Sequence, residues 1–295
     1  MQQRSNLQRR QIRKGILLLV PAMALISIFY LSPAIVSVFY SLTNISQVGR
    51  KAVHWSFVGA ANYAMMLRDG RFWVSLGNTA IFLLFSAIIG QNGLGFLIAY
   101  LMQRKSLWFR RLVGMAVLLG LVTPEVVVSI IFFAFFGVEG SLNQGLALFG
   151  ISPKTWLFSC SMLSIILANI WRGTAFSMLM FQSALDSVPS ELLESAHLDG
   201  AGPLRTLVGV TLPVIQGTIL TNTVLITIST IGVFGMIFAL TGGGPGLSST
   251  TVPIYMYQKA FASYQIGYGS AIAIVLLCFG IALSLFYTKA FRSQA

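Results

Sequence analysis

Six long hydrophobic runs, separated by polar segments, dominate the pattern of the chain. A helix needs about 20 apolar residues to cross roughly 30 Å of hydrocarbon, and every run is at least this long. An extended strand leaves its backbone unpaired in lipid, so the runs are predicted to be helical. The pattern predicts an all-α integral membrane protein with six transmembrane helices in a single domain, residues 1–295, with spans near residues 15–41, 73–101, 111–137, 156–182, 208–240 and 264–288.

The composition supports this reading. Of the 295 residues, 56% are hydrophobic and only 9% are charged, whereas a soluble domain carries about 25% charged residues. The basic segment before the first run resembles the start of a signal peptide. The run from Gly15 to Tyr40 is too long for a signal peptide's hydrophobic region, so we expect a retained anchor.

The net charge of +12 comes from basic residues whose positions follow the expected membrane topology. A nucleic-acid-binding protein gathers its basic residues on one surface, but here they lie at the ends of the apolar runs, and no nucleic-acid partner is expected. With the N-terminus inside, the inner segments carry twelve Lys and Arg residues and the outer segments carry six. This asymmetry predicts that both termini are cytoplasmic.

The inner segment 186–207 departs from that bias, because it contains Asp186, Glu191, Glu194 and Asp199, four of the seven acids in the chain. Local signals predict a short helix over 189–199, with acids in its first turns and a glycine after its end. Helices that lie on a membrane surface are usually rich in Lys and Arg. A protein partner therefore explains an acidic helix better than lipid does.

This segment resembles the cytoplasmic loop of permease subunits from binding-protein-dependent ABC importers. The family motif Glu-Ala-Ala-x-x-Asp-Gly-Ala matches 194–201, with Ser195 in place of the first alanine, and Leu212-Pro213 closes the loop. Further matches to the carbohydrate branch, which contains maltose permeases, extend over nearly the whole chain: Phe57–Tyr63, Asn78-Thr79, Gly140–Asn143, Asn169–Trp171, Thr241–Pro245 and Ile254-Tyr255.

The resemblance implies a type I ABC importer transmembrane domain in a bacterial or archaeal plasma membrane. Its expected partners are membrane lipid, a second homologous permease, a cytoplasmic ATPase dimer and an extracytoplasmic solute-binding protein. The loop 186–207 is expected to hold a coupling helix that docks on the ATPase. In this sequence the matching coupling residues are Glu191, Glu194, Ala196, Asp199, Gly200 and Ala201.

The chain itself is not expected to be an enzyme. It has no Gly-x-x-x-x-Gly-Lys-Ser/Thr loop for nucleotide phosphates, so ATP and Mg²⁺ are expected on the partner ATPase subunits. No catalytic residues, no metal site and no cofactor of its own are predicted. A secondary transporter coupled to ions is an alternative, but it would need ionisable residues in several spans, and only Glu125 and Arg172 qualify.

A polar stripe marks the fifth span. Thr223, Thr227, Thr230 and Phe234 recur at helical spacing, with Ser229 beside them. Hydroxyl side chains often join helices within membranes, so packing and a substrate pathway both remain open from spacing alone. The resemblance places the substrate chamber along the fourth and fifth spans, which implies the pathway residues Asn169, Arg172, Gly173, Phe176, Thr227, Ser229, Thr230 and Phe234.

The resemblance further implies a sugar or small oligosaccharide as the solute, since aromatic and polar side chains suit stacking and hydrogen bonding. Arg172 departs from the uncharged position of maltose permeases and keeps glycerol phosphate, or another polar or anionic solute, open as an alternative. Glu125 lies at a similar depth on the neighbouring span. Arg172 is therefore predicted either to pair with Glu125 or to bind the solute directly.

Overall fold

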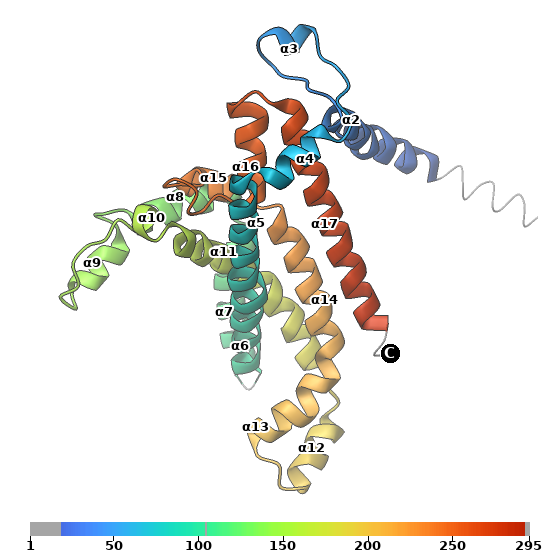
Figure 1. The fold of residues 1–295 in the computed structure, drawn as a ribbon. Coiled ribbons are helices and arrows are strands. Elements are labelled where there is room, and N and C mark those ends of the chain that lie inside the picture. Colours follow the sequence, from blue (N-terminus) through green and yellow to red (C-terminus); the bar gives the residue numbers. More distant parts are fainter. Residues whose placement is uncertain (1–18, 104, 293–295) are drawn as a thin grey trace, which may run out of the picture. The chain divides into compact units, whose positions relative to one another are not determined.

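A computed structural model describes residues 19–103 and 105–292 (Figure 1). In these ranges the chain is helical and contains no strand, only an isolated bridge between Thr43 and Phe57. This confirms the all-α prediction. Residues 15–18 of the first predicted span and the basic residues before them lie outside the described residues. The described ranges contain six helical segments long and apolar enough to cross a membrane: Leu19–Ser41, Gly70–Met102, Glu125–Ala147, Ser161–Asp186, Pro203–Ile231 and Ile266–Tyr287.

The chain divides into two compact units. Unit 1 contains residues 1–68 and 256–275. Its described part starts with the helical segment from Leu19, which continues through a π-helical turn. The elements of this unit that begin before residue 69 are η1 (Ser27–Leu31), α2 (Ser32–Ser41), α3 (Arg50–Val53) and α4 (Ala61–Arg68), and they are joined by η4 (Gln258–Ala262) and the start of α17 (Ile266–Arg292).

Hydrogen bonds around the end of α2 hold unit 1 together. The buried amide of Asn62 donates to the carbonyls of Ser41 and Thr43, each at 2.8 Å, and the Tyr63 hydroxyl lies 2.7 Å from the Ser41 hydroxyl. A Cβ atom on Gly267 would lie 2.1 Å from the Thr43 carbonyl oxygen, so only glycine permits this approach of α17. Asn62 and Tyr63, which belong to one of the family-like motifs, thus fasten the segment after α2 to the end of that helix.

Unit 2 contains residues 69–255 and 276–295 and carries most of the spans. In Figure 1, α5 and α6 form one long rod with η2 between them. In chain order the elements are α5 (Gly70–Phe82), η2 (Leu83–Gln91), α6 (Asn92–Met102), α7 (Leu107–Val122), α8 (Glu125–Phe136), α9 (Ser141–Ala147), α10 (Trp156–Ser159), α11 (Ser161–Asp186), α12 (Ser190–Leu198), α13 (Pro203–Thr206), η3 (Leu207–Thr211), α14 (Leu212–Ile231), α15 (Gly235–Thr241) and α16 (Val252–Tyr257).

Two predicted spans differ from the observed helices. The run 111–137 is divided into α7 and α8, because Pro124 lacks a backbone N–H and disfavours helix in the residue before it. The run 208–240 is also divided, since α14 ends at Ile231 and α15 starts at Gly235 after a C-cap at Gly232. Continuous hydrophobicity predicted one helix in each of these runs and hid both breaks.

Two buried clusters form the core of unit 2. One joins α8, α11 and α15 through residues that include Phe132, Ile165 and Met236. The other joins α6, α11 and the start of α14 through residues that include Phe181 and Ile215. α11 contributes to both clusters, so it is the central helix of the unit.

The glycine-rich loop after α15 is held by the helix α5. The amide of Asn78 donates to the carbonyls of Leu247 and Thr250 at 2.6 and 3.1 Å. The hydroxyl of Thr79 accepts the backbone N–H of Val252 at 2.9 Å. Gly243 has φ of +91°, and a Cβ atom there would lie 2.7 Å from the Thr250 hydroxyl. Two family-like motifs far apart in the sequence are therefore parts of one folded corner.

Candidate functional site

Helix α12 is the first part of the candidate site. It spans Ser190–Leu198, within the helix predicted over 189–199, and Pro189 is its N-cap residue. Ala196 is buried and Leu193 packs on the second core cluster. These two residues hold one face of α12 against the spans, while the other residues of the helix are exposed.

A left-handed glycine closes α12. Gly200 has φ of +74°. Its backbone N–H donates to the carbonyl of His197 at 3.0 Å, and the N–H of Ala201 donates to the carbonyl of Ala196 at 2.9 Å. These two bonds define a Schellman motif with Gly200 at the position where glycine is preferred. The predicted turn at Gly200 is thus confirmed, and its physical basis is the backbone conformation.

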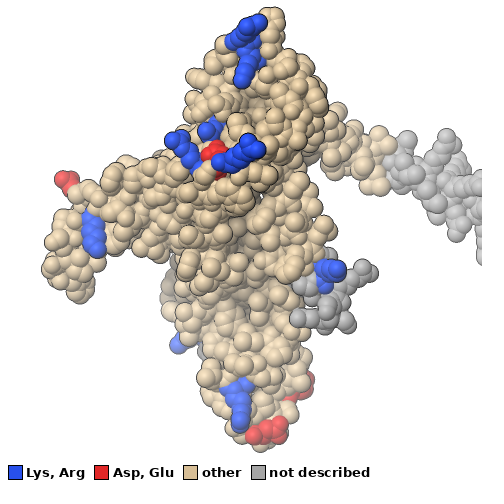
Figure 2. All heavy atoms as spheres, in the orientation of Figure 1, with Lys and Arg blue, Asp and Glu red and all other residues tan. Residues whose placement is uncertain are grey.

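The outward face of α12 is acidic with leucines at its edges. Glu191, Glu194 and Asp199 are exposed, and Leu198 is 89% exposed. Figure 2 shows acidic side chains, with a basic side chain beside them, at the end of unit 2 that α12 and α13 form. A mixed acidic and apolar face of this kind is suited to contact a protein.

The second part of the site is an ion pair between two spans. Nη1 of Arg172, on α11, lies 3.0 Å from Oε1 of Glu125, at the start of α8, and each side chain is 32% exposed. A Cβ atom on Gly235 would lie 3.0 Å from Oε2 of Glu125. The start of α15, next to Phe234, therefore approaches the same carboxylate. The structure brings together Arg172 and Glu125, as predicted for a pair.

Two other predicted pathway residues take part in packing between α11 and η2. The amide of Asn169 is buried and donates to the Ser86 hydroxyl at 2.8 Å. The buried amide of Gln91 donates to the Asn169 carbonyl at 3.0 Å. A Cβ atom on Gly173 would lie 2.2 Å from this Gln91 side chain. Asn169 and Gly173 thus join two helices, and their role in a pathway stays a prediction.

The remaining pathway candidates differ in exposure. Ser229 is exposed, Phe176 and Phe234 are half-buried, and Thr227 and Thr230 are buried at 2% and 4%. Phe234 stacks on Phe238 with ring centroids 5.2 Å apart. The stripe predicted along the fifth span therefore splits into an inward threonine face and a more accessible part near its end.

The sequence analysis missed a polar junction between α6, α11 and α14. The buried amide of Asn222 donates to Asn92 at 2.8 Å and to the Ser177 hydroxyl at 2.9 Å. The amide of Asn92 donates to the Thr223 hydroxyl at 3.1 Å. An asparagine within an apolar run is the available signal, because a buried amide needs partners. Among the described residues, no group of three or more His, Cys, Asp or Glu side chains is arranged to hold a metal ion.

Comparison with known proteins agrees with this architecture. The chain is 34% identical to the multiple sugar-binding transport system permease of Streptococcus mutans, over 88% of each chain. It is 30% identical to the sulfoquinovosyl glycerol transport system permease of Agrobacterium fabrum, over 95% of this chain and 91% of the relative. It is 31% identical to the sn-glycerol-3-phosphate transport system permease of Yersinia pseudotuberculosis, over 91% of both.

Solved structures show the same fold. A chain of the bacterial ABC transporter that imports the acidic polysaccharide alginate has a TM-score of 0.81 at 21% identity, with 99% of both chains covered. A chain of the inward-facing methionine transporter has a TM-score of 0.55, covering 79% of this chain and 98% of its own. The family model for binding-protein-dependent transport system inner membrane components matches residues 91–292, and this protein belongs to that family.

Proposed function

We propose that the chain is one of two permease subunits of an ATP-driven importer and forms half of the path for a sugar or small oligosaccharide. Its membership of the inner membrane component family supports the transport role. The names of the relatives, which include a multiple sugar-binding system, support the solute class. The partners are a homologous permease, a cytoplasmic ATPase dimer that binds ATP and Mg²⁺, and an extracytoplasmic solute-binding protein.

The observation that carries the coupling role is the geometry of α12. A short helix fixed by Leu193 and Ala196 and closed by Gly200 presents an exposed acidic face at one end of unit 2. A rigid projection can pass movement of an ATPase to the spans, as rigid-body alternating access requires. We place the loop 186–207 and both termini in the cytoplasm, in agreement with the charge asymmetry.

The observation that bears on the solute is the exposure of the central ion pair. A charged side chain that faces lipid at mid-span costs about 2.5–3.5 kcal/mol on insertion scales. Arg172 lies near the middle of α11, and its side chain is one-third exposed. The exposed part is therefore better explained if it faces the partner permease or a water-filled path than if it faces lipid. Phe176 follows one turn later on the same side of α11. Together they offer a donor and an aromatic surface to a solute.

An anionic solute is the second candidate, and Arg172 favours it. The pair with Glu125 engages Nη1, and the guanidinium carries five N–H donors in all. Relatives named for glycerol phosphate and for alginate, an acidic polysaccharide, belong to systems that carry such solutes. Glu125 neutralises the arginine, so a neutral sugar remains the first candidate.

The test is reconstitution of the importer in vesicles with its binding protein and ATPase. We expect the chain to copurify with the ATPase and solute-loaded binding protein to stimulate hydrolysis. Uptake of a radiolabelled neutral sugar and of its phosphorylated counterpart then separates the two solute classes. Uptake driven by an ion gradient without ATP would contradict the proposal and support the secondary transporter.

A further inference from the structure

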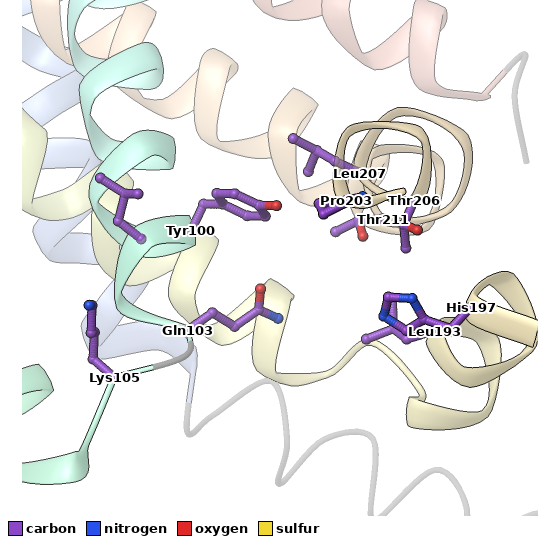
Figure 3. A pocket seen from close by; sticks show the side chains of 10 residues that line it. Tyr100, Gln103, Lys105, Leu193, His197, Pro203, Thr206, Leu207 and Thr211 are labelled. Carbon is purple, nitrogen blue, oxygen red and sulfur yellow. The ribbon is translucent and has the colours of Figure 1, made fainter. Parts of the chain in front are cut away.

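A pocket lies between α12 and the ends of two spans in unit 2. Its volume is about 460 Å³, within the range of roughly 300–1,000 Å³ typical of small-molecule sites. The lining residues come from the end of α6, from α12, from α13 and from η3 (Figure 3): Tyr100, Leu101, Gln103, Lys105, Leu193, His197, Pro203, Thr206, Leu207 and Thr211.

The polar lining is rich in hydrogen-bond donors. Tyr100 and Gln103 point toward the side of the pocket where His197 lies (Figure 3), and the lining includes Lys105 and two threonines. The Gln103 amide also donates to the Leu185 carbonyl at 3.4 Å, and the Thr206 hydroxyl donates to the Gly202 carbonyl at 3.2 Å. Among the described residues that line the pocket there is no aspartate or glutamate. The acids of α12 are Glu191 and Glu194, and both are exposed side chains outside this lining. A pocket with cationic and neutral donors and no carboxylate selects an anion.

The pocket lies at the depth where a membrane span ends. α6 ends at Met102, just before Gln103 and Lys105, and the fifth of the six candidate spans begins at Pro203. Leucines from both spans contribute an apolar wall. Aromatic and basic residues at this depth are typical of the boundary between hydrocarbon and lipid headgroups. The site therefore combines donors for an anion with a surface for an apolar tail.

We propose that this pocket binds the phosphate group of an anionic amphiphile, with Lys105 and His197 on opposite sides of it. The phosphate comes either from the headgroup of a membrane phospholipid or from a soluble phosphoester, and basic pockets at the ends of spans are a known form of headgroup site. Lys105 follows α6 and His197 belongs to α12. An occupied pocket would thus fasten α12 to the end of α6, independently of which solute is carried.

The experiment uses the complete importer in nanodiscs of phosphatidylcholine with increasing phosphatidylglycerol, and bound lipid is counted by native mass spectrometry. One lysine near an anionic surface contributes about a fivefold change in lipid binding. We expect Lys105→Gln to raise the half-saturating phosphatidylglycerol fraction about fivefold and Lys105→Arg to restore it. Arg205→Gln is the matched control, because Arg205 is an exposed basic residue of α13 that lies beside lining residues but does not itself line the pocket.

Glycerol 3-phosphate added to nanodiscs of pure phosphatidylcholine distinguishes the two phosphate sources. Saturable binding that Lys105→Gln weakens would identify a soluble phosphoester, and binding of phosphatidylglycerol alone would identify the headgroup. Equal lipid binding by Lys105→Gln and Arg205→Gln, with no binding of glycerol phosphate, would overturn the proposal. If Lys105→Gln does not assemble, His197→Gln supplies the same comparison from α12.

Discussion

Replacement of Gly200 by alanine tests whether the turn after α12 is needed for coupling. Gly200 has φ of +74°, and a Cβ atom there would meet nothing within 4 Å. The substitution therefore adds backbone strain without a steric clash. An L-residue in the left-handed region costs about 1–2 kcal/mol, so the closed turn should become about 5- to 30-fold less populated relative to open forms. Gly200→Asn should lose less, because asparagine tolerates this conformation.

The assay combines hydrogen exchange of residues 190–201 with copurified ATPase and solute-stimulated hydrolysis. Gly202→Ala is the matched control, since Gly202 is also exposed and free of neighbours but has an ordinary φ of −71°. In Gly200→Ala we expect faster exchange at the amides of residues 200 and 201, together with weaker coupling to the ATPase. In Gly202→Ala we expect neither change. Coupling that is the same in Gly200→Ala and Gly202→Ala, despite faster exchange, would remove this turn from the mechanism.

Three further predictions concern the spans and the topology. Arg172→Gln should lower the stability and folded yield by leaving Glu125 unpaired, a loss of about 1–3 kcal/mol. Glu125→Gln in the same chain should restore both. An unchanged yield and an unchanged melting temperature in Arg172→Gln would contradict a structural pair. Gly173→Ala should lower stability by about 1–3 kcal/mol through overpacking against Gln91, with Gln91→Ala relieving it; equal melting temperatures would refute the contact. A cysteine at exposed Ser195 should react with an impermeant maleimide only in opened cells, and labelling of intact cells would contradict a cytoplasmic loop.

The acidic helix was predictable because its signals are local. Pro189 at the start, acids in the first turns and Gly200 after the end each act within a few residues. The structure places α12 at Ser190–Leu198 with Gly200 in the left-handed region. The identity of its inward face was less predictable. Leu193 packs on the second core cluster whereas the adjacent Leu192 is 44% exposed, because packing on other helices decides which leucine turns inward.

The breaks in the spans show what an apolar run conceals. Pro124 is a local signal, but hydrophobic residues continue on both sides of it, so the run reads as one helix. The π-helical stretch η2 has no signal of this kind, since it contains no proline. Such stretches depend on the neighbours of a helix. Here Gln91 ends η2 and donates to the Asn169 carbonyl across the contact with α11.

Spacing alone also failed to separate polar packing from a pathway, and burial now supplies that distinction. Asn169 and Asn222 are almost completely buried and donate to other helices within the chain, so their polarity is accounted for by helix association. Arg172 is different, because one-third of its side chain remains exposed beside Glu125. Lipid cannot cover a mid-span charge without a penalty. Under the proposed function, the surface around Arg172 is therefore the part of the fourth span that a second permease or a water-filled path would complete.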